Sequence, residues 1–436
     1  MKPLYRQLLA GLLALILLRP LPVWADGPTL GGCPLFPVDN IWNTPIDQLP
    51  VDASSSAYIT SIGATTRLHA DFGAGEWPPG SGSKIGIPFV VVPASQPLVA
   101  ITSFLYASQS DPGPYPIPPN APIEGAPSTS GDRHVLVLRQ GECKLYELYR
   151  AFPNGNGTWR GDSGAVFTLT GHALRPDGWT SADAAGLPIL PGLARFDEVL
   201  AGEIKHALRF TAPQTQRGYV WPARHFASGN TNPALPPMGQ RFRLKASFVI
   251  DNSFSPQGRV LLRAMQKYGL ILADNGSAWY ISGAPDERWD NDALTADFNR
   301  VRGSDFEAVN VSSLQISANS GQVVGFGLAV TPAGRAVNPG ASVPFTLTVS
   351  YNGSFSQPVA LTAAVSPALP LQLQPTSVST TGSAVVTLTD THSGQLLPGV
   401  WHTLWLTATG GGLTRTAQTW LLVGGSRVYL PLLLKP

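Results

Sequence analysis

Between Val324 and Ser426 the sequence repeatedly alternates apolar residues with Thr, Ser or Gln, and this period of two is its most constraining feature. The alternating segments are 342–350, 359–364, 384–389, 402–409 and 416–423, and Gly, Pro or Asn turns separate them. A period of two places neighbouring side chains on opposite faces of a strand, so one face can be buried while the other meets water. Several such segments in succession predict an antiparallel β-sandwich of about 100 residues.

This stretch is also poor in charge, since Arg335, Asp390 and Arg415 are its only charged residues. The turns Pro339-Gly340 and Leu397-Pro398-Gly399 each precede an expected strand. In these features the stretch resembles the immunoglobulin-like modules appended to secreted bacterial enzymes and surface proteins. The resemblance implies a fold and no activity.

The preceding residues also predict a β-rich fold, because the chain contains 45 Gly and 41 Pro, a share well above the average of about 12%. This composition excludes coiled coils and helical solenoids and favours short strands joined by turns. Segments 134–138 and 144–149 flank Gln140-Gly141 and predict a hairpin, and 240–250 and 270–273 are also expected to be extended. The fold class is therefore mainly β: a sandwich-like or α+β N-terminal domain with a few helices, followed by the immunoglobulin-like sandwich.

Two helices are expected in the N-terminal domain. Ser255-Pro256 is a typical helix start, and Gly269 is a typical stop. A second helix is expected over 196–208.

The N-terminus predicts export. Lys2 and Arg6 precede an apolar run of eleven residues, 8–18, and Val23-Trp24-Ala25 provides a cleavage site for a signal peptidase. The run is shorter than the roughly 20 residues that a membrane-spanning helix needs. The alternative is a retained anchor. We expect a protein that is secreted, extracellular or at the cell surface, with no transmembrane span after cleavage.

Export has two further consequences. Cleavage removes basic residues and leaves a near-neutral chain, so nucleic acid is not an expected partner. Cys33 and Cys143 would meet an oxidising compartment, where a disulfide between them is expected; two unpaired buried thiols are the alternative. The expected organisation is a signal peptide over 1–25, a catalytic or glycan-binding domain over 26–322, the sandwich over 323–426 and an apolar tail over 427–436, which is either an extra edge strand or a docking tail.

The N-terminal domain resembles sequences of uncharacterised secreted bacterial proteins. The motifs that carry this resemblance are Asp39-Asn-Ile-Trp-Asn43, His69-Ala-Asp-Phe-Gly73, Gly131-Asp-Arg-His134 and the segments 175–188 and 219–225. The resemblance brings no activity with it, so function is inferred from the residues.

Two segments place a histidine two residues from a carboxylate: His69 with Asp71, and Asp132 with His134. An extended backbone would direct both members of a pair to the same face of a sheet. A carboxylate can then orient an imidazole, or both side chains can bind a cation. The alternative is that both pairs make hydrogen bonds that fix loops.

The expected helix over 196–208 carries further candidates. Glu203 and His206 are three residues apart and would share one helix face, although Glu203 can equally be a solvated residue. Glu198 lies in the first turn, where an acid is also favoured by the helix dipole.

Segment 219–225 brings together aromatic and polar residues that suit sugar binding. Three further tryptophans outside it, Trp179, Trp401 and Trp405, are also candidates. Sugar sites combine flat apolar rings with a few fixed polar groups, although core packing is the ordinary role of a tryptophan. In the expected sandwich, Trp401 and Trp405 share one strand face, where they either bind glycan or pack against the neighbouring domain. The residues are Trp179, Tyr219, Trp221, Arg224, His225, Trp401 and Trp405.

The main prediction is a secreted enzyme that acts on a polysaccharide or cell-wall glycan, without a cofactor. In a hydrolase, Asp71 with Asp132 or Glu198 would provide the acid and the base, and His134, His206 and His225 would orient groups or transfer protons. A lyase would use His225 or Tyr219 as its base and Arg224 to neutralise a uronate. The alternatives are a non-catalytic glycan-binding or adhesion protein and a metal-dependent hydrolase that uses His69, Asp71, His134 and His206.

Overall fold

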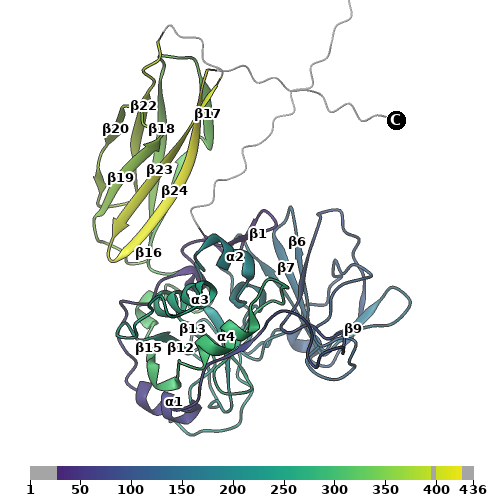
Figure 1. Ribbon diagram of the computed structural model, residues 1–436. Coiled ribbons are helices and arrows are strands. Elements are labelled where there is room, and N and C mark those ends of the chain that lie inside the picture. The colour runs from purple at the N-terminus through teal and green to yellow at the C-terminus, as the bar shows by residue number, and fades with distance from the viewer. Residues whose placement is uncertain (1–26, 394–398, 425–436) are drawn as a thin grey trace, which may run out of the picture.

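The computed structural model describes residues 27–393 and 399–424, and within them the chain is mainly β, as predicted. Figure 1 shows a β-sandwich standing above an N-terminal region that contains all four α-helices described. The expected signal peptide and the apolar tail lie outside the described residues. Within the described ranges, no helix is both long enough and apolar enough to cross a bilayer.

A six-stranded mixed sheet forms the centre of the N-terminal region. Its strand order is β15-β12-β13-β11-β14-β3, in which β11 is parallel to β13 and β14 is parallel to β3. The strands are short, and the central strand β13 begins with four buried apolar residues, Leu270–Ala273, whereas the edge strand β3 contains no buried residue. Their bounds are β3 His69–Asp71, β11 Leu208–Ala212, β12 Arg241–Leu244, β13 Leu270–Asn275, β14 Tyr280–Ser282 and β15 Phe306–Val309.

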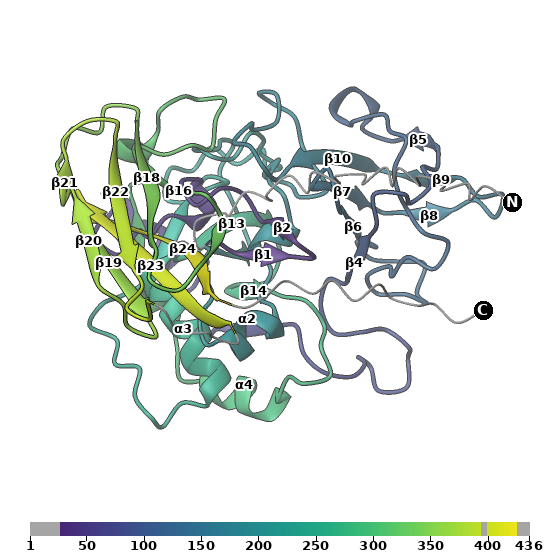
Figure 2. The same ribbon diagram turned by 90° about the horizontal axis from the view of Figure 1, so that it is seen from above.

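A second, four-stranded sheet of order β10-β7-β6-β4 lies beside the first, as Figure 2 shows from above. Strands β6 and β7 form the predicted antiparallel hairpin. The predicted disulfide between Cys33 and Cys143 is confirmed, and it ties β2 to the turn of this hairpin. The remaining strands of this region have the following bounds: β1 Thr29–Leu30, β2 Cys33–Pro34, β4 Phe89–Val92, β5 Ile101–Phe104, β6 Val135–Arg139, β7 Lys144–Tyr149, β8 Phe152–Pro153, β9 Trp159–Gly161 and β10 Ser163–Thr168.

Helix α3 (Pro256–Lys267) begins and ends where the sequence predicts. The Ser255 hydroxyl accepts a hydrogen bond from the Gly258 N–H, and Pro256 occupies the first turn. Helices α1 (Ser55–Ile62) and α4 (Asn291–Phe298) had no clear signal in the sequence.

The helix expected over 196–208 is much shorter than predicted. Helix α2 spans Phe196–Ala201 and stops at Gly202, whose φ of 88° is left-handed. A glycine adopts this conformation without the strain that a side chain would add, so it ends helices readily. The chain then turns into strand β11, and Glu203 and His206 do not share a helix face.

The sandwich consists of two sheets of order β16-β18-β22-β20 and β17-β24-β23-β19-β21. Each predicted alternating segment lies within one of its strands, because the buried side chains between the sheets recur at every second position. The bounds are β16 Gly325–Thr331, β17 Gly334–Val337, β18 Ser342–Asn352, β19 Val359–Ser366, β20 Leu371–Gln374, β21 Ser377–Val378, β22 Gly382–Thr389, β23 Val400–Gly410 and β24 Leu413–Val423.

The Asp39 carboxylate links the sandwich to the N-terminal region. Its Oδ2 accepts hydrogen bonds from Asn352 at 2.7 Å and from Gln322 at 2.9 Å. Its Oδ1 lies 3.2 Å from Nε2 of His172. One buried acid therefore connects the motif 39–43 to the end of strand β18 in the sandwich.

Candidate functional site

Neighbouring strands of the six-stranded sheet bring Asp71, Ser282 and Arg209 into one cross-strand row. Asp71 on β3 is in register with Ser282 on β14. The antiparallel register of β14 and β11 continues the row to Arg209, whose Nη1 donates to the Ser282 hydroxyl at 2.6 Å. An exposed carboxylate and a buried guanidinium therefore lie on the same face of the sheet.

A second row lies next to the first on that face. His69 is in register with Tyr280, which is in register with Thr211, which in turn pairs with Asp274 on β13. The rings of His69 and Tyr280 stack with their centroids 4.0 Å apart. The predicted pair His69 and Asp71 does share one face, because β3 is extended as the spacing requires.

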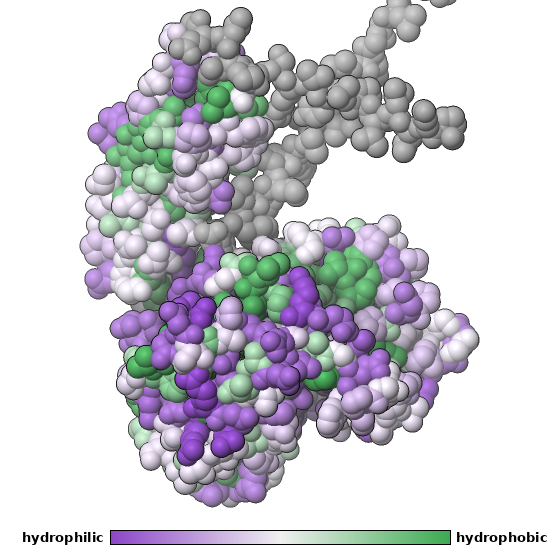
Figure 3. Space-filling model, viewed as in Figure 1, coloured by the Kyte–Doolittle hydropathy of each residue, from purple (hydrophilic) through white to green (hydrophobic). Residues whose placement is uncertain are grey.

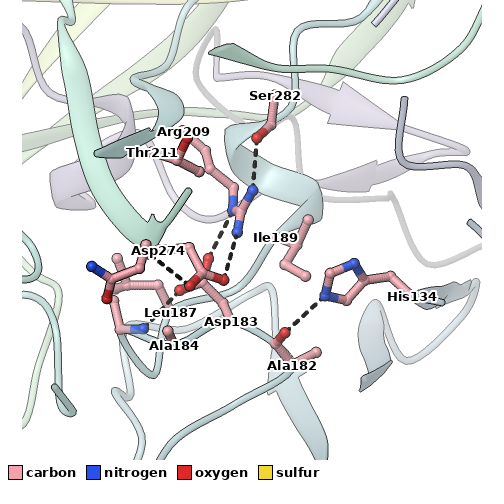
Figure 4. A network of polar contacts seen from close by, with 12 residues as sticks. His134, Ala182, Asp183, Ala184, Leu187, Ile189, Arg209, Thr211, Asp274 and Ser282 are labelled. Carbon is pink, nitrogen blue, oxygen red and sulfur yellow. Dashed lines mark hydrogen bonds and ion pairs between the residues drawn. The ribbon is translucent and has the colours of Figure 1, made fainter. Parts of the chain in front are cut away.

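Arg209 also contacts two acids, one of which lies on a loop that covers the sheet. Its Nε donates to Oδ2 of Asp183 at 2.7 Å, and its Nη2 lies 3.5 Å from Oδ2 of Asp274. Figure 4 shows the guanidinium pointing at Asp183 and Ser282. Both Asp183 and Arg209 are buried, so this ion pair fixes the loop over the sheet.

His134 joins the hairpin sheet to the same loop. Its Nε2 donates to the carbonyl oxygen of Ala182 at 3.0 Å, and its Nδ1 donates to Oε2 of Glu124 at 2.5 Å. The backbone of His134 also exchanges hydrogen bonds with Glu124 in both directions. With Glu124 ionised, both ring partners are acceptors and both ring nitrogens carry hydrogen, which makes His134 an imidazolium cation; the lowered pKa of Glu124 and the raised pKa of His134 agree with this assignment.

We call the group of Asp71, Glu124, Asp132, His134, Asp183, Arg209 and Asp274 the acidic cluster. Its five carboxyl groups outnumber its two cations. Burial changes across the cluster: Asp183, Arg209 and His134 are buried, Glu124 and Asp274 are half-buried, and Asp71 and Asp132 are exposed. The buried ion pairs therefore form a fixed base beneath carboxylates that a solute can reach.

Asp71 and Glu124 are electrostatic neighbours whose surroundings shift their pKa values in opposite directions. Although part of the Asp71 side chain reaches solvent, the surrounding protein partly desolvates its carboxyl group. This desolvation, together with the negative charges of Glu124 and Asp132, raises the pKa of Asp71. Burial also favours the neutral form of Glu124, but the charge and hydrogen bonds of His134 outweigh it and lower the pKa of Glu124. The first carboxyl thus retains its proton more readily than the second.

The remaining members have shifts that agree with their contacts. Burial opposes the charge on His134, yet Glu124 raises the pKa of this imidazole to about 9. Burial raises the pKa of Asp183 to about 6 and also raises that of Asp274, while Arg209 opposes both shifts. The same burial disfavours the charge on Arg209, but its two acids raise its pKa and keep it a cation.

A pair of carboxyls with separated pKa values is the arrangement that general acid/base chemistry requires. One protonated group can donate to a leaving oxygen while an ionised neighbour accepts a proton or stabilises positive charge. Among the residues that the structure describes, no three His, Cys, Asp or Glu side chains are placed to hold a metal ion.

The pair Asp132 and His134 is not arranged as expected. Arg133 between them has a left-handed φ of 48°, so the backbone is not extended there. The turn leaves Asp132 exposed and directs His134 into the protein, although the two charges still interact.

Glu198 and His206 belong to a separate, buried network of polar contacts. Nε2 of His206 lies 3.0 Å from Oε2 of Glu198, and Nη2 of Arg195 lies 2.9 Å from Oε1 of the same carboxylate. Both candidates are buried and fully engaged there. Glu203 is exposed and pairs with Lys267 at 2.9 Å. These contacts support the fold around α2 and do not reach the acidic cluster.

The segment 219–225 is also held by local contacts. The Tyr219 hydroxyl donates to Asp177 at 2.8 Å, and the Trp221 indole N–H donates to the carbonyl of Ser320 at 2.8 Å. The buried Arg224 donates to the backbone carbonyls of Arg175 and Ala318 and to the Asn319 side chain.

Trp179 belongs to the same loop as Asp183, and His225 contacts that loop. The Arg175 guanidinium lies 5.5 Å from the Trp179 ring centre. Nδ1 of His225 donates to the carbonyl of Ala184 at 2.8 Å, so His225 supports the loop next to Asp183. Trp401 and Trp405 stand on the sandwich, 56% and 42% exposed, away from the acidic cluster.

Four members of the acidic cluster escaped the prediction of the site: Glu124, Asp183, Arg209 and Asp274. Two of them had a local signal. Arg209 is a charge within an apolar strand segment, and Asp274 directly follows the expected strand 270–273, where ligand-binding side chains often lie in parallel sheets. Glu124 and Asp183 lie in loops without such a pattern.

Two cavities lie outside the acidic cluster. One of about 560 Å³ runs along α3, and another of about 560 Å³ lies between the end of α3 and the sandwich; none of the residues lining either belongs to the acidic cluster. The cluster itself runs from the buried Asp183 and Arg209 to the exposed Asp71 and Asp132.

Comparisons with known proteins assign no family to this chain. No family model matches it, and no curated protein matches it. Among solved structures, it is similar to the periplasmic chaperone SfaE (13% identity, TM-score 0.20, 24% of this chain and 60% of that chain) and to domains 4 and 5 of the S-layer protein SbsC (16%, 0.17, 23% and 51%). It is also similar to a family 123 glycoside hydrolase from Clostridium perfringens (9%, 0.20, 23% and 28%). The chain thus spans less than two thirds of each, and TM-scores this low identify neither a fold family nor an activity.

Proposed function

We propose that the acidic cluster is the active site of a glycoside hydrolase that acts on uncharged glycans. The observation that carries the proposal is that the exposed Asp71 interacts electrostatically with Glu124, which His134 holds as a carboxylate through a contact of 2.5 Å. Two carboxyl groups, one a proton donor and the other an anion, are the minimum that glycosidic hydrolysis needs.

In the proposed reaction, Asp71 donates its proton to the glycosidic oxygen as the bond from that oxygen to the anomeric carbon breaks. A water oxygen forms the new bond to the anomeric carbon and gives its proton to Glu124. The raised pKa of Asp71 and the lowered pKa of Glu124 favour this assignment of roles. The balance is one water consumed and one reducing end released.

The charge of the cluster supports an uncharged substrate. Five acids against Arg209 and His134 would repel a uronate. The stacked rings of His69 and Tyr280 lie in the row next to Asp71, where they offer an apolar contact to a sugar ring. A lyase that neutralises a uronate with Arg224 has less support, because that guanidinium is buried and already bonded to backbone carbonyls.

We further propose that the protein works outside the cytoplasm. The disulfide between Cys33 and Cys143 is of the kind that persists in oxidising compartments. The signal sequence expected over residues 1–25 agrees with this location.

The test is to incubate the purified protein with insoluble and soluble neutral polysaccharides and to measure new reducing ends. We expect activity that D71N and E124Q each lower by roughly 10²–10⁴-fold. D292N changes an exposed aspartate in the first turn of α4 and serves as the matched control. Unsaturated products would identify a lyase instead, and equal activity of D71N and the parent would remove Asp71 from the reaction.

A further inference from the structure

The outer face of one sandwich sheet carries an aromatic surface that the proposed active site does not use. Trp401, Thr403 and Trp405 point outward from β23, while His402, Leu404 and Leu406 between and beyond them are buried. Trp401 is 56% exposed and Trp405 is 42% exposed. The alternative in which these indoles pack against the N-terminal region is therefore wrong.

A third tryptophan and a glycine hold the first indole in place. Trp420 on β24 is in register with Thr403, and its ring meets the Trp401 ring at 5.0 Å with an angle of 63°. Trp420 is also in register with Gly334 on β17, where a Cβ atom would lie 2.1 Å from the Trp420 ring. Gly334 thus leaves the space in which Trp420 lies, and Trp420 in turn supports Trp401.

The side chains next to Trp405 are small or polar. It is in register with Ala364 on β19 and with Gln418 on β24. On β23, Thr403 precedes it and Thr407 follows it on the same face. The neighbours of Trp405 on this face are therefore small, hydroxylic or amidic, and none of those named carries a charge. Trp401 is instead in register with Leu422 on β24, which is buried and so adds little apolar surface. Figure 3 likewise shows that the most hydrophilic colour is sparser on the sandwich than on the N-terminal region.

We propose that the surface formed by Trp401, Trp405 and Trp420, with Thr403 and Gln418, binds an extended, uncharged polysaccharide. Trp405 follows Trp401 by four positions on the strand, which places the two residues about 13 Å apart along β23. A glycan chain that follows the strand can lay the apolar faces of its sugar rings on both indoles. The threonine hydroxyls and the glutamine amide lie where they can meet its hydroxyl groups.

The chemistry of this surface favours that ligand over the other occupants. A charged polymer would find no complementary charge among these residues. A second copy of the chain or another protein would be expected to contact aliphatic residues, yet the alternating threonines make this face more polar than a stable protein interface. Indole rings beside hydroxyl and amide groups are instead what sugar recognition requires.

Binding at this surface goes beyond the proposed hydrolysis and does not depend on it. The parent for the test is therefore the full chain with D71N, which binds without turnover if Asp71 is catalytic and binds equally if it is not. The probes are microcrystalline cellulose and crystalline chitin, and the measurement is the fraction of protein depleted from solution. Loss of hydrolysis with retained binding, or the reverse, separates the two proposals.

We expect W401A/W405A to bind at least tenfold more weakly, and W401F/W405F to recover part of the affinity because phenyl rings still stack on sugars. W77A is the matched control, since Trp77 is 70% exposed on a loop of the N-terminal region. Thermal unfolding of each variant confirms that the sandwich is folded. Equal binding by W401A/W405A and the parent, retention of the parent by neither probe, or a dimer that W401A/W405A dissociates in sedimentation equilibrium would each overturn the proposal.

Discussion

Nδ1 of His134 lies 2.5 Å from Oε2 of Glu124, and this ion pair connects a proline-rich loop to the first residue before β6. The contact has two consequences. It places an ionised carboxylate beside Asp71, and it ties the hairpin sheet, through the carbonyl of Ala182, to the loop that carries Asp183. The charge next to Asp71 and the link between the hairpin sheet and the loop therefore depend on the same two side chains. The first three predictions concern this site, and the last concerns the disulfide.

The first prediction concerns the pH dependence of hydrolysis. Asp71 must be protonated to act as an acid, so kcat/KM falls as the pH rises through the pKa of Asp71. Asp132 is one of the negative charges that raise this pKa. Replacing it in D132N makes ionisation of Asp71 easier, and the alkaline limb of the pH profile moves to lower pH by up to about one unit. An unchanged limb, or a shift to higher pH, contradicts the proposed role; D292N serves as the remote control.

The second prediction concerns stability at alkaline pH. The pKa of His134 is about 9 in the folded protein, above its ordinary value of 6.5. The contribution of this ion pair to the free energy of unfolding is therefore complete below pH 6.5. It is lost as the pH rises through 9, with a slope of up to about 1.4 kcal/mol per pH unit. Urea unfolding between pH 6 and 10 measures this slope.

The variant E124Q removes the charge that raises the pKa of His134, so it flattens the slope. It also costs about 1.5–3 kcal/mol near neutral pH, because a hydrogen bond to a charged group becomes a weaker one. E203Q is the control, since Glu203 forms an exposed ion pair with Lys267. If E124Q and the parent showed the same slope between pH 6.5 and 9, the imidazolium assignment would fail.

The third prediction concerns the ion pair beneath the site. Arg209 and Asp183 are both buried, and their contact is 2.7 Å. R209M leaves Asp183 without its cation inside the protein, so unfolding should require about 3–5 kcal/mol less free energy. The exposed Arg263 on α3 provides the control R263M, which should change stability by less than about 0.5 kcal/mol. Equal stabilities of the two variants would show that the pair contributes little.

The sequence predicted those elements whose signals are local. The alternation over 342–350 and 416–423 repeats every two residues, so the signal for each strand lies within its own segment. Ser255 and Pro256 likewise mark the start of α3 without any distant contact. The helix over 196–208 was overestimated because the left-handed Gly202 was not recognised as its end.

The acidic cluster was predicted only where its members are close in sequence or already stood out as histidines and carboxylates. His69 and Asp71 share a face by spacing alone. Arg209 instead reaches Asp183 across 26 residues and Asp274 across 65, through a strand order, β13-β11-β14-β3, that no local pattern specifies. The burial that separates the pKa values of Asp71 and Glu124 also arises only after the sheets have assembled.

The last prediction concerns the disulfide, which joins residues 110 positions apart. A crosslink of this span restricts the unfolded chain, and the chain-entropy model gives about 4–5 kcal/mol for it. The variant C33S/C143S should therefore melt well below the parent. Reducing agent should lower the melting temperature of the parent to nearly that of the variant and leave the variant unchanged, which separates loss of the crosslink from an effect of the serines. Because Cys33 is buried while the acidic cluster is held by its own ion pairs, hydrolysis by the folded variant should match that of the parent at low temperature. A parent whose melting does not respond to reducing agent would show that the crosslink does not limit its stability.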